Sequence, residues 1–372
     1  MRVLHAPANV GNQPWVLSRA ERALGVESDL IVNYSTWLDY PADRVLGEYG
    51  VRGQRDWLRR AWHGFGAPFR YDVLHYYFGR TLLYWDDWPP KCGFPFLDAR
   101  LAKRLGRKVF FTLQGCDARL AAESNRCNRH TMCREGGCSA YATCISSIDD
   151  TRRRLIETVL PHADQVFYLN PELGHYVPGG SFMPYANVDV EMIRPAEAAP
   201  NPRPLVLHAP SDPSIKGTPL IEAALKRLSS QFDFDYLPVK GIPHAQAMEL
   251  YRRADLVIDQ VLSGWYGGFA VEVMAMGKPV AVYLRDEDLG FLPAAMREDL
   301  PFVRLRPDRL DEDLTAAFER REEWPALGAA SRRYVMRWHN PALIARAMID
   351  AYRDPQSRFD LAAATASSTQ SG

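Results

Sequence analysis

The sequence predicts an α/β protein of two domains, each built around a parallel β-sheet. Its 372 residues suit two domains of ordinary size better than one. Short apolar runs alternate with longer helical stretches, and this alternation begins again after a proline-rich stretch. Apolar residues make up 47% of the chain and charged residues 24%, so both domains can bury a core.

The first half of the chain contains four expected strands separated by helices. Runs rich in β-branched and aromatic residues predict the strands, and glycines that follow Leu24 and Leu105 predict helix ends. The expected elements are strand Arg2–His5, helix Trp15–Leu24, strand Tyr71–Tyr77, helix Asp98–Leu105, strand Lys108–Leu113, helix Asp149–Leu160 and strand Gln165–Leu169.

The second half repeats this order after an expected linker that contains Pro195, Pro200, Pro202 and Pro204. Its expected elements are strand Leu205–His208, helix Pro219–Leu228, strand Asp233–Leu237, helix Ala245–Arg253, strand Leu256–Ile258, helix Phe269–Met276, strand Pro279–Tyr283 and a final helix Pro341–Tyr352. The predicted domains are therefore 1–190, with a cysteine-rich insert at 116–144, and 205–340. Residues 191–204 form the linker, 341–355 the final helix and 356–372 a disordered tail.

The net charge and the N-terminal sequence limit the expected binding partners and the expected location of the protein. Forty-five basic residues balance forty-five acidic ones, so no long-range attraction to nucleic acid is expected. The N-terminus lacks the features of a signal peptide, and no stretch approaches the roughly 18 apolar residues needed to cross a bilayer. We expect a cytoplasmic protein, and a peripheral contact with the inner face of the membrane stays open.

Loops that follow the parallel strands are the expected ligand sites, because ligands gather beyond the carboxyl ends of such strands. The first of these loops contains Gly11 and Asn12. Gly11 allows the backbone to approach a ligand closely, and the N-terminus of the next helix favours an anion. A simple tight turn is the alternative.

Two loops of the second domain carry stronger signals. Lys216 and Gly217 stand just before a helix, so a cation and backbone donors can hold phosphates together. Gly267 and Gly268 form a turn into the helix that carries Glu272. We place Glu272 in the first turn of that helix, where it can accept both hydroxyls of a ribose; a structural acid is the alternative.

The run Glu272-Val-Met-Ala-Met-Gly-Lys-Pro-Val280, together with Lys216-Gly217, resembles the donor half of retaining GT-B glycosyltransferases, a large bacterial group of glycan-building enzymes. The resemblance covers roughly 1–350. It implies two Rossmann-like domains with a cleft between them, an acceptor domain followed by a donor domain, and a final helix that crosses back to the first domain. The segment Tyr71–Arg80 resembles a subgroup often involved in surface polysaccharides.

For the donor site, the resemblance implies that Lys216 contacts the diphosphate and Glu272 the ribose of a UDP-, GDP- or similar sugar. It implies that Gly267, Gly268 and Phe269 contact the donor phosphate or sugar. No divalent metal is needed for catalysis in this family. The implied acceptor is a glycan, a lipid-linked molecule or a small molecule.

Three positions depart from the family pattern. Gly264 stands where the family has its first glutamate, Ser211 where an arginine is common, and Gln114 where a histidine is common. These departures keep two other readings open. One is a sugar-nucleotide epimerase on the same plan, and the other is a non-catalytic binder of a nucleotide sugar or glycan.

The first domain contributes three candidate residues of its own. Asp117 can orient an acceptor or sugar hydroxyl, or it can cap the following helix. Gln114 can hydrogen-bond the transferred sugar. His75 either lines the cleft or packs as a strand-end histidine. Catalysis is expected to come from positioning and from donors that stabilise the departing diphosphate.

Four cysteines, Cys127, Cys133, Cys138 and Cys144, gather in one polar segment. Their number suits a structural zinc site, but the spacings of five, four and five residues differ from the usual Cys-x-x-Cys pairs. An iron–sulfur cluster, free thiols and disulfides are the alternatives.

A helical stripe of Trp57, Leu58, Ala61, Trp62 and Phe65 is accompanied by nearby arginines. Such a stripe usually faces a core. Aromatic and basic residues together also suit a membrane surface.

Overall fold

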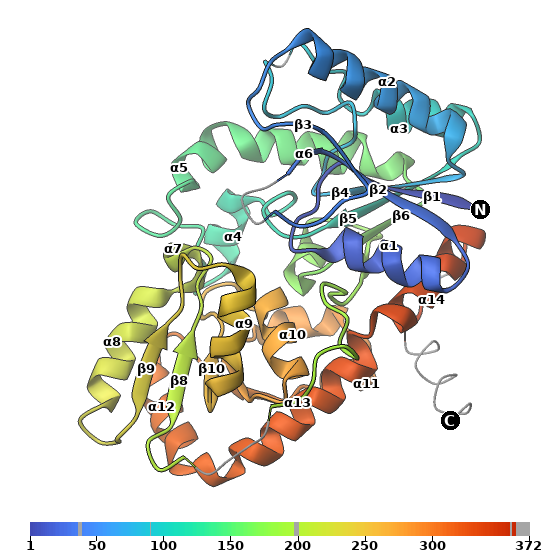
Figure 1. The fold of residues 1–372 in the computed structure, drawn as a ribbon. Helices are drawn as coiled ribbons and strands as arrows, with labels where there is room; N and C mark the ends of the chain where they lie inside the picture. The colour runs from blue at the N-terminus through green and yellow to red at the C-terminus, as the bar shows by residue number, and fades with distance from the viewer. Residues whose placement is uncertain (36–38, 90, 197–200, 358, 362–372) are drawn as a thin grey trace. The chain divides into compact units, whose positions relative to one another are not determined.

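The computed structural model describes residues 1–35, 39–89, 91–196, 201–357 and 359–361, and the chain divides into two compact units. The first unit comprises Met1–Arg119, Asp150–Asp189 and Asn340–Gly372, and the second comprises Leu120–Asp149 and Val190–His339 (Figure 1). Each unit contains one parallel sheet, as the sequence predicts.

The first unit is built on a seven-stranded sheet in which each neighbouring pair is parallel, with the order β3-β2-β1-β4-β5-β6-β7. The strands are β1 Arg2–Ala6, β2 Glu27–Tyr34, β3 Arg44–Gly47, β4 Val73–Tyr77, β5 Lys108–Leu113, β6 Gln165–Tyr168 and β7 Ser181–Phe182. The central strands are buried along their length because helices cover both faces.

Five longer helices belong to this sheet. They are α1 Gln13–Ala23, α2 Gln54–Arg70, α3 Leu97–Arg104, α6 Asp149–Thr158 and α14 Pro341–Arg353. Helix α1 packs against α14, and α2 packs against α3 on the opposite face of the sheet (Figure 1). The final helix therefore completes the first unit, although more than 150 residues of the second unit precede it in the chain.

A buried polar network ties α14 to the sheet. His75 on β4 lies with one ring nitrogen 2.6 Å from the hydroxyl of Tyr352 and the other 2.7 Å from that of Thr112. Next to it, His5 lies between the hydroxyl of Tyr77 and the carboxylate of Glu21, at 2.8 Å from each. Burial, and secondarily the charge of His5, lowers the pKa of His75 well below its ordinary value. From the sequence, His75 could either line the cleft or pack at the end of a strand. In the structure its ring is fully buried.

Replacing Tyr352 by phenylalanine should lower the free energy of unfolding by about 1–3 kcal/mol, because the ring stays but His75 loses its shortest hydrogen bond. Urea unfolding monitored by circular dichroism measures this change. The matched control is Tyr49→Phe, since Tyr49 is 66% exposed. An unfolding midpoint for Tyr352→Phe equal to that of the wild type would contradict this role.

The second unit is built on a five-stranded parallel sheet with the order β12-β11-β10-β8-β9. Its strands are β8 Leu205–His208, β9 Asp235–Pro238, β10 Leu256–Ile258, β11 Val280–Val282 and β12 Phe302–Arg304. Its helices are α4 Ala121–Cys127, α5 Tyr141–Thr143, α7 Pro213–Lys216, α8 Thr218–Leu228, α9 His244–Arg253, α10 Gly268–Ala275, α11 Ala294–Glu298, α12 Leu310–Glu319 and α13 Trp324–Trp338.

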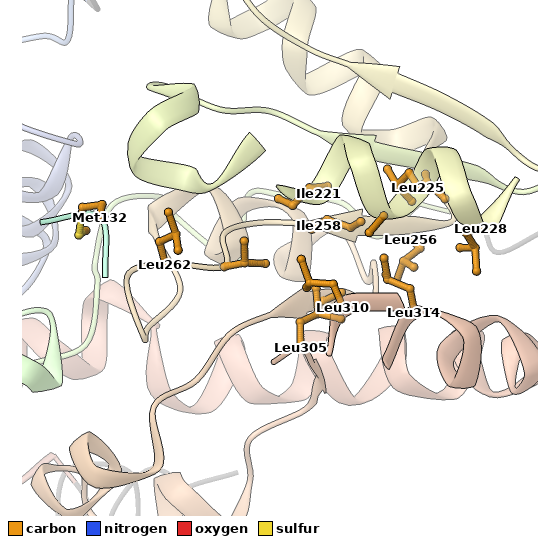
Figure 2. Packing of buried hydrophobic residues seen from close by; sticks show 14 of the residues in the cluster. Met132, Ile221, Leu225, Leu228, Leu256, Ile258, Leu262, Leu305, Leu310 and Leu314 are labelled. Atoms are coloured by element: carbon orange, nitrogen blue, oxygen red, sulfur yellow. The ribbon is translucent and has the colours of Figure 1, made fainter. Parts of the chain in front are cut away.

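The core of the second unit includes residues far apart in the chain. Ile221 and Leu225 of α8 pack with Leu256 of β10 and Leu314 of α12 (Figure 2). Met132, from the cysteine-rich segment, belongs to the same buried cluster and lies beside Leu262 in Figure 2. This packing explains why 120–149 groups with the second unit, whereas the sequence places the insert 116–144 in the first domain.

Some elements differ from the expected ones. The strands β2 and β3 are not expected from the sequence, because charged residues such as Glu27 and Arg44 begin them and mask the apolar pattern. Part of the expected linker, residues 197–200, and most of the expected tail, residue 358 and 362–372, lie outside the described residues. Phe359, within the expected tail, packs its ring against Phe167 at 5.0 Å.

Candidate functional site

The candidate site lies at the carboxyl edge of the five-stranded sheet, where the connections after β8 and β10 meet. The Nζ atom of Lys216 is 3.0 Å from Oδ1 of Asp259, the residue that follows β10. The other carboxylate oxygen of Asp259 accepts a hydrogen bond from the backbone N–H of Gly267 at 2.6 Å. Asp259 is only 1% exposed. One buried carboxylate thus holds both the ammonium group and the glycine turn.

The ammonium group of Lys216 keeps donors for a ligand. It carries three N–H groups, and Asp259 is the acceptor found for it within the described ranges. Its side chain is 12% exposed. Lys216 is thus a partly exposed cation held in place by the buried carboxylate of Asp259. Such a cation is suited to bind an anion such as a diphosphate.

Local sequence sets the position of Lys216. Asp212 caps α7, since its Oδ1 accepts hydrogen bonds from the N–H groups of Ser214 at 2.9 Å and Ile215 at 3.3 Å. Gly217 then separates α7 from α8 with φ of 78°, a left-handed conformation that favours glycine. A Cβ atom there would lie 2.5 Å from Cγ2 of Val261. Only glycine fits, so the turn that ends α7 at Lys216 depends on it.

Gly267 is required for a different reason, because Lys216 and Asp259 lie close to the position that a Cβ atom would occupy. Its φ of −102° is open to any residue, but a Cβ atom would lie 3.1 Å from Nζ of Lys216. A side chain at this position would crowd the ammonium group. Gly268 is the first residue of α10, and Phe269 follows it with its ring packed on Tyr251 at 4.9 Å.

Glu272 lies on α10, and His244, at the start of α9, is its partner. The Nε2 atom of His244 is 3.1 Å from Oε2 of Glu272. Glu272 is 8% exposed, whereas the side chain of His244 is 47% exposed. The placement of Glu272 in the first turn is wrong: α10 already begins at Gly268, which makes Glu272 its fifth residue. Glu272 therefore lies beyond the first turn, and its side-chain partner is His244.

The pKa of His244 is raised above its ordinary value by its hydrogen bond to Glu272, and burial partly opposes this. A raised folded-state pKa stabilises the folded chain at pH below about 6.5, and the contribution disappears as pH rises through the folded-state pKa. The substitution Glu272→Gln should return the titration midpoint of His244 toward its ordinary value. Proton NMR of the imidazole signals measures it, with His244→Gln to assign the resonance. A midpoint that does not move would contradict the pairing.

Gly264 stands where the resembling family has its first glutamate, and the structure explains the glycine. Its φ is 73°, and a Cβ atom would lie 2.9 Å from Cζ of Arg285. The guanidinium of Arg285 pairs with Asp288 at 2.8 Å and donates to the carbonyl of His130 at 3.1 Å. A buried ion pair therefore occupies the space that a longer side chain at position 264 would need.

In the first unit, Gly11 and Asn12 form the turn between β1 and α1. Both have positive φ, 62° and 61°, and the side-chain amide of Asn12 donates to the carbonyl of Asn187 at 3.2 Å. Gln13 accepts from the N–H of Ala186 at 2.6 Å. The loop is held on two sides, and Gly11 stays exposed at its tip.

Asp117 and Gln114 lie together in the loop after β5. The carboxylate of Asp117 accepts hydrogen bonds from the N–H groups of Gln114 at 3.0 Å and Gly115 at 2.7 Å, so it closes its own loop. Burial raises the pKa of Asp117, and these N–H groups partly offset the effect. The following helix, α4, is capped by Asp149 instead, at 3.0 Å from the N–H of Ala121. The side-chain amide nitrogen of Gln114 has no acceptor within the described residues.

The cysteine-rich segment does not form the zinc site considered from the sequence. Cys133 and Cys144 are buried in the apolar core of the second unit, Cys138 packs against that core and Cys127 is exposed. Within the described residues, no group of three or more histidine, cysteine or acidic side chains could hold a metal ion. A tetrahedral zinc site would need all four of these side chains around one ion, and their burial differs from one cysteine to the next.

Two residues of this site are not found from the sequence. Asp259 follows an expected strand, and the rule that ligand sites lie beyond such strands could have indicated it. His244 has no comparable signal, because its partner lies 28 residues away in the chain.

No protein-family model matches the sequence, and no curated protein matches it. Solved structures do resemble the fold. Sucrose-phosphate synthase from Thermosynechococcus elongatus matches over 95% of this chain and 98% of its own, with 15% identity and a TM-score of 0.59. Anabaena HepE in complex with UDP and glucose matches over 95% and 99%, with 12% identity and a TM-score of 0.58.

A Listeria monocytogenes protein described as a UDP-N-acetylglucosamine 2-epimerase matches over 96% of this chain and 98% of its own, with 12% identity and a TM-score of 0.51. Such low identities show the fold alone. The two parallel sheets, the final helix on the first unit and these neighbours agree, and the chain therefore has the two-domain GT-B fold of glycosyltransferases.

Proposed function

We propose that this protein is a glycosyltransferase that moves a sugar from a nucleotide-sugar donor to an acceptor hydroxyl. The observation that carries the proposal is the arrangement of Lys216 and Gly267 on the buried carboxylate of Asp259. It places a cation beside the N-terminus of α10 at the ligand-binding edge of a parallel sheet. That combination suits the diphosphate of a nucleotide sugar, and the GT-B fold is compatible with it.

The donor is proposed to bind through two anchors. Lys216 and the backbone N–H groups at the start of α10 hold the diphosphate, with Gly267, Gly268 and Phe269 around it. Glu272 accepts the ribose hydroxyls, which replace His244 as its partner. Three structures of Anabaena HepE contain UDP, UDP with glucose, or UDP-glucose, which supports a UDP-sugar as the first donor to test; a GDP-sugar or similar donor is the alternative.

The proposed reaction breaks the bond between the anomeric carbon and the diphosphate, and forms a bond to the acceptor oxygen with retention. The acceptor proton passes to the departing diphosphate. Lys216 supplies the positive charge that stabilises this leaving group, so a divalent metal is not part of the proposal. Gln114 is proposed to hydrogen-bond a sugar hydroxyl, for which its amide nitrogen, buried and without an acceptor within the described residues, has to become accessible. Asp117 serves mainly to shape that loop, and the acceptor is a glycan, a lipid-linked glycan or a small molecule.

A thermal-shift screen of the purified chain against UDP-, GDP-, ADP- and dTDP-sugars, without metal, tests donor binding. Ligand at 100 times its dissociation constant stabilises the folded state by about 2.7 kcal/mol, which is readily measured. Release of nucleoside diphosphate with acceptor glycans, followed by mass spectrometry of the product, tests transfer. Binding without turnover would favour the non-catalytic binder, and recovery of an epimerised donor would favour the epimerase. No stabilisation by any donor would contradict the proposal.

A further inference from the structure

Helix α2 exposes an apolar stripe that the rest of the first unit does not cover. Leu58, Trp62, Phe65 and Phe69 recur at intervals of four, three and four residues, so they share one face of the helix. Their exposed fractions are 61%, 66%, 36% and 60%. The ring of Phe94, itself 38% exposed, lies 5.4 Å from that of Phe65 and extends this stripe.

The opposite face of α2 packs on the first unit, so the stripe faces away from it. Ala61 belongs to a buried cluster with Leu83 and Trp85, and Trp57 packs against it. A Cβ atom at Gly64 would lie 2.3 Å from Cδ2 of Leu83, so the helix sits directly on its neighbours. The stripe expected from the sequence therefore divides in two. Trp57 and Ala61 face the core, and Leu58, Trp62 and Phe65 face away from it.

Exposed arginines accompany the stripe on α2 and on the neighbouring α3, although the whole chain has a formal net charge of zero. Arg55, Arg59 and Arg70 on α2 are exposed, as are Arg100 and Arg104 on α3, which packs beside α2 (Figure 1). None of these five arginines has an acidic partner within the described ranges. Asp56 is the one acid of α2, and the acid of α3, Asp98, is buried.

The arrangement of these groups identifies the kind of partner. The guanidinium carbon of Arg70 lies 5.5 Å from the ring centroid of Trp62, so cation and aromatic ring face the same side. A second copy of this chain placed on the stripe would bring two sets of arginines together, which is unfavourable. An apolar, aromatic face flanked by arginines is instead complementary to the anionic headgroups and acyl boundary of a bilayer.

We propose that the stripe Leu58–Trp62–Phe65–Phe69, with its flanking arginines, docks on the surface of an anionic lipid membrane. The proposed contact is peripheral. No helix within the described residues is long and apolar enough to cross a bilayer. The apolar side chains enter the interface while the arginines stay at the headgroups. This binding is separate from sugar transfer and can be measured without any nucleotide sugar.

Co-sedimentation of the full chain with vesicles tests the proposal. Vesicles of phosphatidylcholine with about one-third phosphatidylglycerol should bind the protein, pure phosphatidylcholine vesicles should bind it much less, and added salt should weaken the binding. The double variant Trp62→Gln/Phe69→Gln should bind at least about tenfold more weakly, because two exposed rings no longer enter the bilayer. The variant Arg55→Gln/Arg59→Gln should lose most of the preference for anionic vesicles.

The matched control is Met192→Gln/Leu220→Gln, which removes two exposed apolar side chains from the second unit and should bind like the wild type. Thermal unfolding of each variant checks that the fold is kept, which is expected because the substituted side chains are exposed. Equal binding by the wild type and the α2 variants would overturn the proposal. So would wild-type protein that leaves the anionic vesicles unbound but forms a dimer that the α2 substitutions abolish.

Discussion

Replacing Lys216 by alanine is expected to weaken the affinity for the nucleotide-sugar donor by about ten- to one-hundred-fold. Hydrogen bonds to charged groups contribute about 1.5–3 kcal/mol each, and about 1.4 kcal/mol corresponds to a factor of ten. Lys216 is the partly exposed cation on Asp259 at the sheet edge, so its loss removes charge where the diphosphate is proposed to lie. Isothermal titration calorimetry with the donor identified by thermal shift measures the change.

The single substitution leaves the buried carboxylate of Asp259 without its cation, which can destabilise the protein. The double variant Lys216→Met/Asp259→Asn removes both charges and keeps the side-chain volumes, so it should fold and still bind the donor weakly. The variant Asp259→Asn keeps the lysine, but its side chain has one acceptor oxygen where the carboxylate has two. It can therefore accept from Lys216 or from the N–H of Gly267 with that oxygen, and a smaller loss of donor affinity is expected. Lys226→Ala is the control, since Lys226 is exposed on α8. Wild-type affinity in the double variant would refute the role of Lys216.

Replacing Gly328 by alanine is expected to destabilise the second unit by about 3 kcal/mol or more. Gly328 lies in α13, which packs against α10. A Cβ atom on it would lie 2.1 Å from the carbonyl oxygen of Gly277, and a backbone atom cannot swing away as a side chain can. Relief of that contact requires α13 to move from the turn that ends α10.

The melting temperature of Gly328→Ala should fall by about 6–12 °C, measured by differential scanning calorimetry. Gly66→Ala, in the interior of α2, is the matched control. There the nearest atom to the added Cβ is Cζ of the flexible side chain of Arg70, at 3.4 Å. This control should be neutral or stabilised by about 0.5–1 kcal/mol, because alanine favours the helix. A Gly328→Ala protein as stable as the wild type would show that α13 does not depend on this contact.

The Gly328 variant tests the stability of the fold, and the Lys216 variants test donor binding. Gly328 is not one of the proposed donor groups, and its substitution should act first through stability. Lys216 is partly exposed, and its effect should appear in affinity even in a variant that folds normally. A transferase, a non-catalytic binder and an epimerase would all need the donor anchors, and only product analysis distinguishes them.

The sequence alone predicts the fold class and the two parallel sheets, but it misses strands β2 and β3, and the site residues that it names stay predictions. The alternation of apolar runs with helices predicts two parallel sheets, because strand spacing and helix spacing are local properties of the chain. Lys216, Gly217 and Gly267 lie in the connections after β8 and β10, where the general rule for parallel sheets places ligands, and Glu272 lies on the helix that follows. The resemblance of the run that begins at Glu272 then suggests the nucleotide-sugar donor.

Only the tertiary structure decides which of these groups meet. The pairings of Lys216 with Asp259 and of His244 with Glu272 join residues 43 and 28 positions apart, and no periodic pattern encodes them. The same limit explains the cysteines, which are close in sequence although Cys133 and Cys144 are buried in an apolar core and Cys127 is exposed. It also explains α2, whose spacing predicts one amphipathic stripe. Whether each aromatic residue faces a core or solvent depends on the neighbours that the rest of the chain supplies, and these partly bury Trp57 while leaving Trp62 exposed.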